Sequence, residues 1–138
     1  MPNGNFAILD TSVYIENFRT GRFTEELIRS PWIIRCSAVV IHELRRGART
    51  GLEIRFVDGL AGKLRIVTPS ERHWYESADV LSRIARKKGY GASKLRDLAF
   101  DALIALSARD IGATVITCNR DDFAEIRKHR PYKVLYWA

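Results

Sequence analysis

Five short apolar segments, separated by stretches with helical periodicity, most constrain how this chain can fold. Each segment is too short for a typical helix and has the length of a buried strand. No turn signal such as Asn-Gly stands between two of them, so hairpins are not expected. Strands that alternate with helices predict an α/β fold with a mostly parallel, five-stranded sheet. The expected strands are Phe6–Leu9, Trp32–Arg35, Leu64–Thr68, Thr114–Cys118 and Tyr132–Trp137.

Helical patterns fill the intervals between these strands, and the 138 residues have the size of one domain. Serines stand where three of the helices would begin, and we expect Ser37, Ser70 and Ser93 to cap them. Gly112 is a natural stop for the last of the three. The expected helices are 12–19, 24–29, 37–47, 49–60, 70–88, 93–111 and 122–129.

Charge and composition narrow the function classes. Lysine and arginine number 23 against 16 acidic residues, a net charge of +7, which suits a nucleic-acid partner or simply a basic soluble surface. No apolar run is long enough for a membrane span, and the start of the chain does not read as a signal peptide. Cys36 and Cys118 form no CxxC pair, so we expect reduced thiols in a cytoplasmic protein. His73 and His129 lack ligand spacing and are expected at the surface.

Asp101 is the most informative residue because it is the only charge in the apolar stretch Leu98–Ala108. Such a stretch predicts a helix that is buried on nearly all sides. A buried carboxylate is costly unless a cation or several donors meet it. Metal binding or catalysis would explain Asp101, as would an ion pair with an arginine, a protonated acid or a cap to another helix. Asp97 lies roughly 40° away round the helix, and either shares the site or pairs with Lys94 and Arg96.

Two more acids stand near expected strand ends. Asp10 directly follows the first strand, where open α/β sheets place their sites. It serves either that site or the start of the next helix, although Ser12 can cap this helix as well. Glu43 lies in a helix that becomes basic from Arg45 onward, so it is either a site acid or an exposed partner of Arg46 or of an arginine on another element.

The segment after the fourth strand, Asn119-Arg120-Asp121-Asp122-Phe123, repeats this pattern. Asn119 or Asp122 either caps the following helix or joins a site at the strand end. Asp121 and Asp122 are adjacent, so only one of them can readily face a given point. We expect Phe123 in the core.

The four acidic segments together favour a metal site. Crowded carboxylates repel one another, and burial would raise their pKa values. A divalent cation removes this conflict, and oxygen ligands without clustered Cys or His suit Mg²⁺ or Mn²⁺. A cation held by few carboxylates keeps positions for water and phosphate oxygens, an arrangement that cuts phosphodiesters.

Four segments of the chain, in the same order, resemble the PIN-domain ribonucleases, and among them the VapC-type toxins of toxin–antitoxin pairs. The resemblance covers almost the whole sequence. Each segment is short and unspecific alone, but four in order make a strong match. They are Leu9–Val13, His42–Gly47, Asp101–Ala105 and Ile116–Phe123.

The resemblance implies one PIN domain over residues 1–138 and an endoribonuclease that depends on Mg²⁺ or Mn²⁺. Asp10, Glu43 and Asp101 match the family's three most constant acids. Asp122 matches the fourth, more variable one, and Asp121 departs from the pattern as a second candidate. The roles implied are metal ligation by Asp10 and Asp101, metal binding or water orientation by Glu43, and completion of the site by Asp122.

The resemblance also implies supporting residues and partners. Ser12 takes the place of a polar residue that commonly follows the first acid, and Thr117 and Asn119 support the site. Family members usually form homodimers, cut RNA to 5′-phosphate and 3′-hydroxyl ends, and are inhibited by an antitoxin whose tail reaches the acidic site. Charge and proximity in the sequence further suggest three residues that hold flanking phosphates, Arg45, Arg46 and Arg120.

Other readings fit less well. A nucleotide-binding site at Gly89-Tyr90-Gly91 would lack its third glycine and the strand that should precede it. A phosphatase with Asp10 as nucleophile would typically have a second Asp where Ser12 stands. A non-catalytic PIN-like module that binds RNA or protein stays open, although all four acidic segments are intact. A PIN nuclease of RNA processing is a further alternative.

Overall fold

A computed structural model describes residues 5–138. The first four residues belong to the segment that does not read as a signal peptide, and they lie outside this range. Five parallel strands form one sheet in the order β3-β2-β1-β4-β5, which confirms the predicted fold class. The strands are β1 (Phe6–Leu9), β2 (Ile33–Ser37), β3 (Ile66–Val67), β4 (Thr114–Thr117) and β5 (Lys133–Tyr136).

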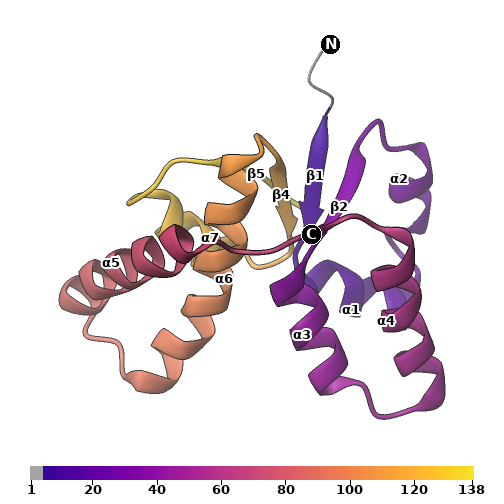
Figure 1. Cartoon of the computed structure of the whole chain (residues 1–138), viewed down its shortest axis with the longest axis horizontal. Coiled ribbons are helices and arrows are strands. Elements are labelled where there is room, and N and C mark those ends of the chain that lie inside the picture. The colour runs from indigo at the N-terminus through magenta and orange to yellow at the C-terminus, as the bar shows by residue number, and fades with distance from the viewer. Residues whose placement is uncertain (1–4) are drawn as a thin grey trace.

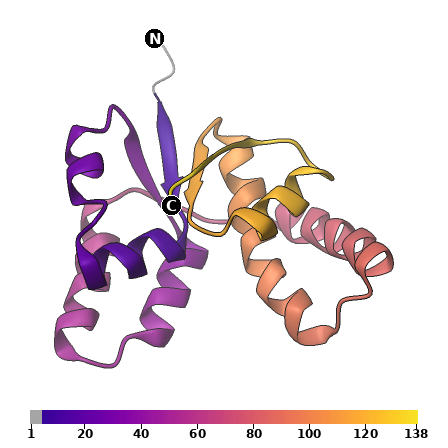
Figure 2. The same cartoon turned by 180° about the vertical axis from the view of Figure 1, so that it is seen from behind.

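Helices flank the sheet in two groups (Figures 1 and 2). One group lies on the side of β2 and the other on the side of β4 and β5. The first group is α1 (Thr11–Thr20), α2 (Thr24–Arg29), α3 (Ala38–Gly47) and α4 (Gly51–Lys63). The second group is α5 (Glu71–Lys88), α6 (Ala92–Asp110) and α7 (Arg120–Arg127).

Three expected caps have different outcomes. Two are confirmed: the Ser37 hydroxyl accepts the Val39 N–H at 3.1 Å, and the Ser70 hydroxyl caps α5 by accepting the His73 N–H at 3.4 Å. Ser93 was predicted to cap α6, and this is wrong. The helix begins at Ala92 after Gly91, which is the capping residue and whose extended backbone turns the chain into the helix, so Ser93 already lies in the first turn.

His73 is buried, 5% exposed, and the expectation of a surface position is wrong for this residue. Its Nδ1 accepts the Ser70 N–H at 2.9 Å, so the Nε2 carries the proton and donates to Asp110 at 2.7 Å. Histidine here takes the part that Glu or Gln usually plays in a capping box. The contact joins the start of α5 to the end of α6.

Helix α6 supplies much of the core because every residue from Asp101 to Ala108 is buried. Ile8 in β1 and Ile116 in β4 are fully buried in the same core. Phe123 is also fully buried, as predicted. This packing holds α6, and the acid that it carries, in a fixed position beside the sheet.

Two predictions from composition also have outcomes. Both cysteines are free, Cys36 buried and Cys118 half-buried. Among the helices of residues 5–138, none combines the length and the apolar character that a bilayer-spanning segment needs.

The burial of α6 predicts a large cost for Leu103→Ala. Leu103 is 1% exposed, so its truncation leaves a cavity and should lower the free energy of unfolding by about 2–5 kcal/mol. Ile28 on α2 is 78% exposed, and Ile28→Ala should change it by less than about 0.5 kcal/mol. Urea denaturation measures both. Equal effects of the two variants would contradict the assigned core.

Candidate functional site

The carboxyl ends of β1 and β4 bring two predicted site residues together. These strands are neighbours, and Leu9 pairs with Ile116, so the next residues, Asp10 and Thr117, lie side by side. The Asp10 side chain is buried and accepts hydrogen bonds from Thr117 at 2.9 Å and from Ser12 at 2.8 Å. Asp10 occupies the capping position of α1 but makes no side-chain cap bond. Its carboxylate therefore belongs to the strand-end cluster.

Backbone amides fix the two hydroxyls that serve Asp10. The Ser12 Oγ accepts the Cys118 N–H at 3.1 Å, and the Thr117 Oγ1 accepts the Asn119 N–H at 2.9 Å. Each hydroxyl uses an acceptor lone pair for the backbone, which leaves its proton to point at Asp10. Burial raises the Asp10 pKa, and these two hydrogen bonds oppose the rise.

Asp101 faces the same cluster from α6. Its burial raises its pKa to about 9, and the negative charges of Asp10, Glu43 and Asp122 add to the effect. The nearest polar group bonded to it is the Asn119 side-chain amide, which donates at 3.5 Å. No arginine in residues 5–138 forms an ion pair with Asp101, so the structural explanation by an arginine partner is not supported.

Glu43 reaches the cluster from α3. Its carboxylate accepts a hydrogen bond from the Thr11 hydroxyl at 2.8 Å. Burial raises the Glu43 pKa, the Thr11 bond opposes this, and the charge of Asp10 adds to the rise. Arg46 lies over the Phe100 ring at 5.5 Å, and its charge also opposes the rise of the Glu43 pKa.

Asp122 completes the cluster from the first turn of α7. Its Oδ2 accepts the Asn119 side-chain amide at 3.0 Å, and its Oδ1 accepts the Lys94 ammonium at 2.7 Å. The adjacent Asp121 is exposed to solvent. The structure thus brings Asp122, and not Asp121, to the other three acids. Helix α7 begins at Arg120, earlier than the predicted start at Asp122, with Asn119 before it.

Other predicted residues lie further out. Asp97 is exposed on α6. Arg45 and Arg46 are exposed on α3, and Arg120 lies over the Tyr136 ring at 4.2 Å. None of these arginines is bonded to the acids in the described residues, so their contact with phosphates stays a prediction.

Two side chains of the cluster were not predicted as site residues from the sequence. Thr11 was passed over as part of a helix start, although it orients Glu43. Lys94 was considered only as one of two possible partners of an exposed Asp97, and in the structure it bonds Asp122. One signal for Lys94 is in the sequence: it precedes Asp101 by seven residues, which is two helical turns on the same face.

The donor set fits a hard divalent cation. Four carboxylates face a common region in which Asp10 and Asp101 are 4% and 9% exposed, and their mutual repulsion calls for positive charge. Within residues 5–138, however, no three Asp, Glu, His or Cys side chains are arranged as the ligands of one ion. The carboxylates are turned toward hydroxyls, an amide and Lys94, so binding requires some of them to rotate.

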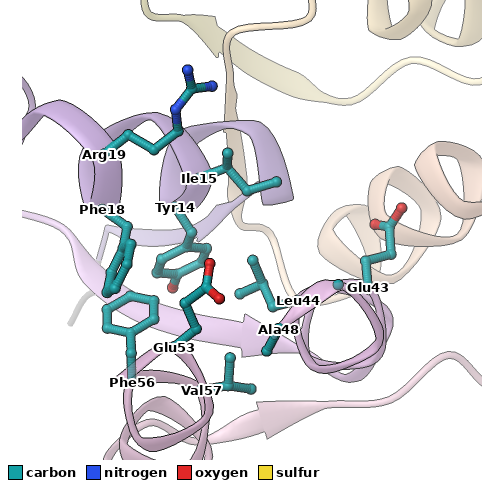
Figure 3. A pocket seen from close by; sticks show the side chains of 11 residues that line it. Tyr14, Ile15, Phe18, Arg19, Glu43, Leu44, Ala48, Glu53, Phe56 and Val57 are labelled. Atoms are coloured by element: carbon teal, nitrogen blue, oxygen red, sulfur yellow. The ribbon is translucent and has the colours of Figure 1, made fainter. Parts of the chain in front are cut away.

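A pocket of about 200 Å³ lies beside Glu43, between α1, α3 and α4 (Figure 3). Phe18 from α1 and Phe56 from α4 pack against each other in its wall, with ring centroids 5.1 Å apart. Glu43 comes from the helix at one side of the pocket, and its carboxylate points away from these apolar side chains. The pocket is therefore an apolar surface that adjoins the acidic cluster.

Asp101 predicts a dependence of stability on pH in the presence of EDTA. Its pKa in the folded chain, about 9, exceeds the ordinary 3.8. The folded state therefore holds a proton that the unfolded state releases, and stability falls as pH rises through this window. Asp101→Asn removes the ionisation and should be more stable than the parent at pH 8 by roughly 1–3 kcal/mol, with little gain at pH 4.

Thermal unfolding at the two pH values measures this difference. Asp97→Asn changes the same charge on the exposed face of the same helix and should show no such gain. A gain for Asp101→Asn that is equal at both pH values would contradict the raised pKa.

Comparison with known proteins gives the family and the fold of the chain. The PIN domain family model matches residues 7–129. No curated protein sequence matches the chain. Among solved structures, a chain of DNA-bound VapBC from Salmonella typhimurium has a similar fold, with 21% identity over 97% of this chain and 99% of that chain and a TM-score of 0.67. A chain of VapBC-1 from nontypeable Haemophilus influenzae has 20% identity over 96% of this chain and 98% of that chain, with a TM-score of 0.69. A chain of VapBC-5 from Mycobacterium tuberculosis has 20% identity over 99% of this chain and 100% of that chain, with a TM-score of 0.65. The family model spans most of the chain, and the chain therefore belongs to the PIN-domain family.

Proposed function

We propose that this chain is a Mg²⁺- or Mn²⁺-dependent endoribonuclease and the toxin of a toxin–antitoxin pair. The observation that carries the proposal is Asp101, a buried acid that forms no ion pair within residues 5–138 and whose pKa the charges of Asp10, Glu43 and Asp122 raise further. Such an arrangement is costly for stability and is typical of a site that binds a cation. Membership of the PIN-domain family supports nuclease chemistry at this position.

Each acid has a proposed task. Asp10 and Asp101, the most buried of the four, hold the divalent ion, and Asp122 completes the set. Glu43 binds the ion or orients the attacking water, since Thr11 already fixes one of its oxygens. A bound divalent ion supplies Lewis acidity and lowers the pKa of a coordinated water. Ser12 and Thr117 keep the Asp10 carboxylate in place.

RNA is the proposed substrate because the chain is basic outside the acidic cluster. The net charge is +7 although four acids gather at one site. Arg45, Arg46 and Arg120 are exposed on the two helices that also carry Glu43 and Asp122, where they can contact phosphates on either side of the cut.

An antitoxin is the proposed protein partner, and the cytoplasm the proposed compartment. The three similar solved structures are VapBC complexes, one of them bound to DNA. We also propose a homodimer, as is usual in the family. The pocket between α1, α3 and α4 is apolar and ends at Glu43, so a partner segment seated in it would lie next to the acids.

The proposed chemistry predicts loss of RNA cleavage in single-atom substitutions. Asp10→Asn and Asp101→Asn keep the side-chain volume but remove a ligand charge, and each should reduce cleavage of labelled RNA at least a hundredfold in Mg²⁺ or Mn²⁺. Asp122→Asn should reduce it less, because this acid is only half-buried and already paired with Lys94.

Asp121→Asn is the matched control for this experiment. It removes the same charge one residue away, at an exposed position, and should leave cleavage within about twofold of the parent. If the parent and both buried-acid variants cut RNA equally, the nuclease proposal is wrong. RNA binding without cleavage at any metal concentration would favour a non-catalytic module.

The proposed partner contact predicts that a substitution in the pocket weakens antitoxin binding while RNA cleavage is retained. Phe18 is 40% exposed at the pocket, and Phe18→Glu places a charge there that an apolar partner segment would have to bury. Co-expression with the proposed antitoxin should then give at least tenfold less co-purified partner, with RNA cleavage retained. Ile28→Glu, exposed on α2 and outside the pocket, should co-purify like the parent. Unchanged co-purification of Phe18→Glu would contradict this contact.

A further inference from the structure

Lys94 is the one basic residue of the described chain that forms an ion pair with any of the four acids. Its ammonium donates to the Asp122 Oδ1 at 2.7 Å. It lies two helical turns before Asp101, which places the two side chains within roughly 20° of each other on α6. Position on the helix and contact with α7 thus bring one positive charge to the edge of the cluster.

A short chain of polar contacts connects this charge to the centre of the site. Lys94 bonds one oxygen of Asp122, and the Asn119 amide bonds the other oxygen at 3.0 Å. The same amide lies 3.5 Å from the Asp101 carboxylate. The acids of α6 and α7 are therefore held together by Asn119 and Lys94.

The Lys94 side chain is partly open to solvent, so its ammonium can move away from the site. Its side chain is 39% exposed, and the Tyr90 ring lies 5.8 Å from the Nζ. Lysine carries its charge on a flexible four-carbon stem, and an exposed pair of this kind is weak. The Asp122 Oδ1 that it occupies is also one of the few oxygens that a divalent ion at this site could use.

We propose that Lys94 is a resident counter-ion that competes with the divalent cation for the acidic cluster. The inference rests on the proposed function, since it concerns the same cation. In the absence of the ion, the ammonium supplies the positive charge beside Asp122 at the edge of the acidic cluster. When the ion binds, it takes over this charge balance and displaces the ammonium from Asp122. Lys94 thereby weakens metal binding and stabilises the metal-free fold.

Binding of Mn²⁺ in the absence of RNA tests this, with free Mn²⁺ followed by electron paramagnetic resonance. Lys94→Met removes the competing charge and should bind Mn²⁺ about three- to tenfold more tightly than the parent. Lys94→Arg keeps the charge and should stay within about twofold of the parent. Lys128→Met is the matched control, because Lys128 pairs with Glu125 at 3.1 Å, outside the acidic cluster, and its loss should not change the affinity.

Thermal unfolding adds a second readout that is independent of activity. In EDTA, Lys94→Met should melt below the parent, and saturating Mn²⁺ should remove the difference. If the salt bridge is purely structural, Lys94→Met should melt at a lower temperature by the same amount with and without Mn²⁺, and its Mn²⁺ affinity should equal that of the parent. That result would overturn this inference but not the proposed function. Failure of the parent to bind Mn²⁺ would overturn the metal requirement of the proposed function and this inference with it.

Discussion

Repulsion among four carboxylates is the interaction on which the rest of this site depends. Asp10, Glu43, Asp101 and Asp122 come from four different elements, and the fold brings them together although like charges disfavour it. The packing of α6 supplies the compensating stability, because the residues from Asp101 to Ala108 are all buried. The core thus holds in place an acid that would otherwise turn to solvent. A cluster maintained at such a cost is best explained by a positive ligand.

The surrounding polar groups divide the site into a rigid part and an adjustable part. Asp10 is fixed by two hydroxyls that backbone amides orient in turn. Asp122 is held by Lys94, a charge on a flexible and partly exposed stem. The rigid acid suits a permanent ligand position, whereas the adjustable pair suits a group that exchanges partners when a cation enters.

Local sequence patterns predicted much of this arrangement. Asp101 stood out because a lone charge in an apolar helix must find a partner, and Asp10 because it follows a buried strand. Contacts between distant segments were harder to predict. Adjacent residues such as Asp121 and Asp122 differ only in which way α7 turns them, and the pairing of Lys94 depends on how α6 packs against α7. His73 was misjudged because a capping contact, rather than ligand spacing, explains its burial.

The central claim is that the four acids share one divalent cation, and a crystal soaked in Mn²⁺ tests it most directly. Anomalous scattering locates manganese independently of any model of the site. We expect a peak within ligand distance of both the Asp10 and the Asp101 carboxylates, with Glu43 or Asp122 turned toward it. Manganese bound only elsewhere on the molecule, with these carboxylates still directed at their present hydroxyl and amide partners, would contradict the account.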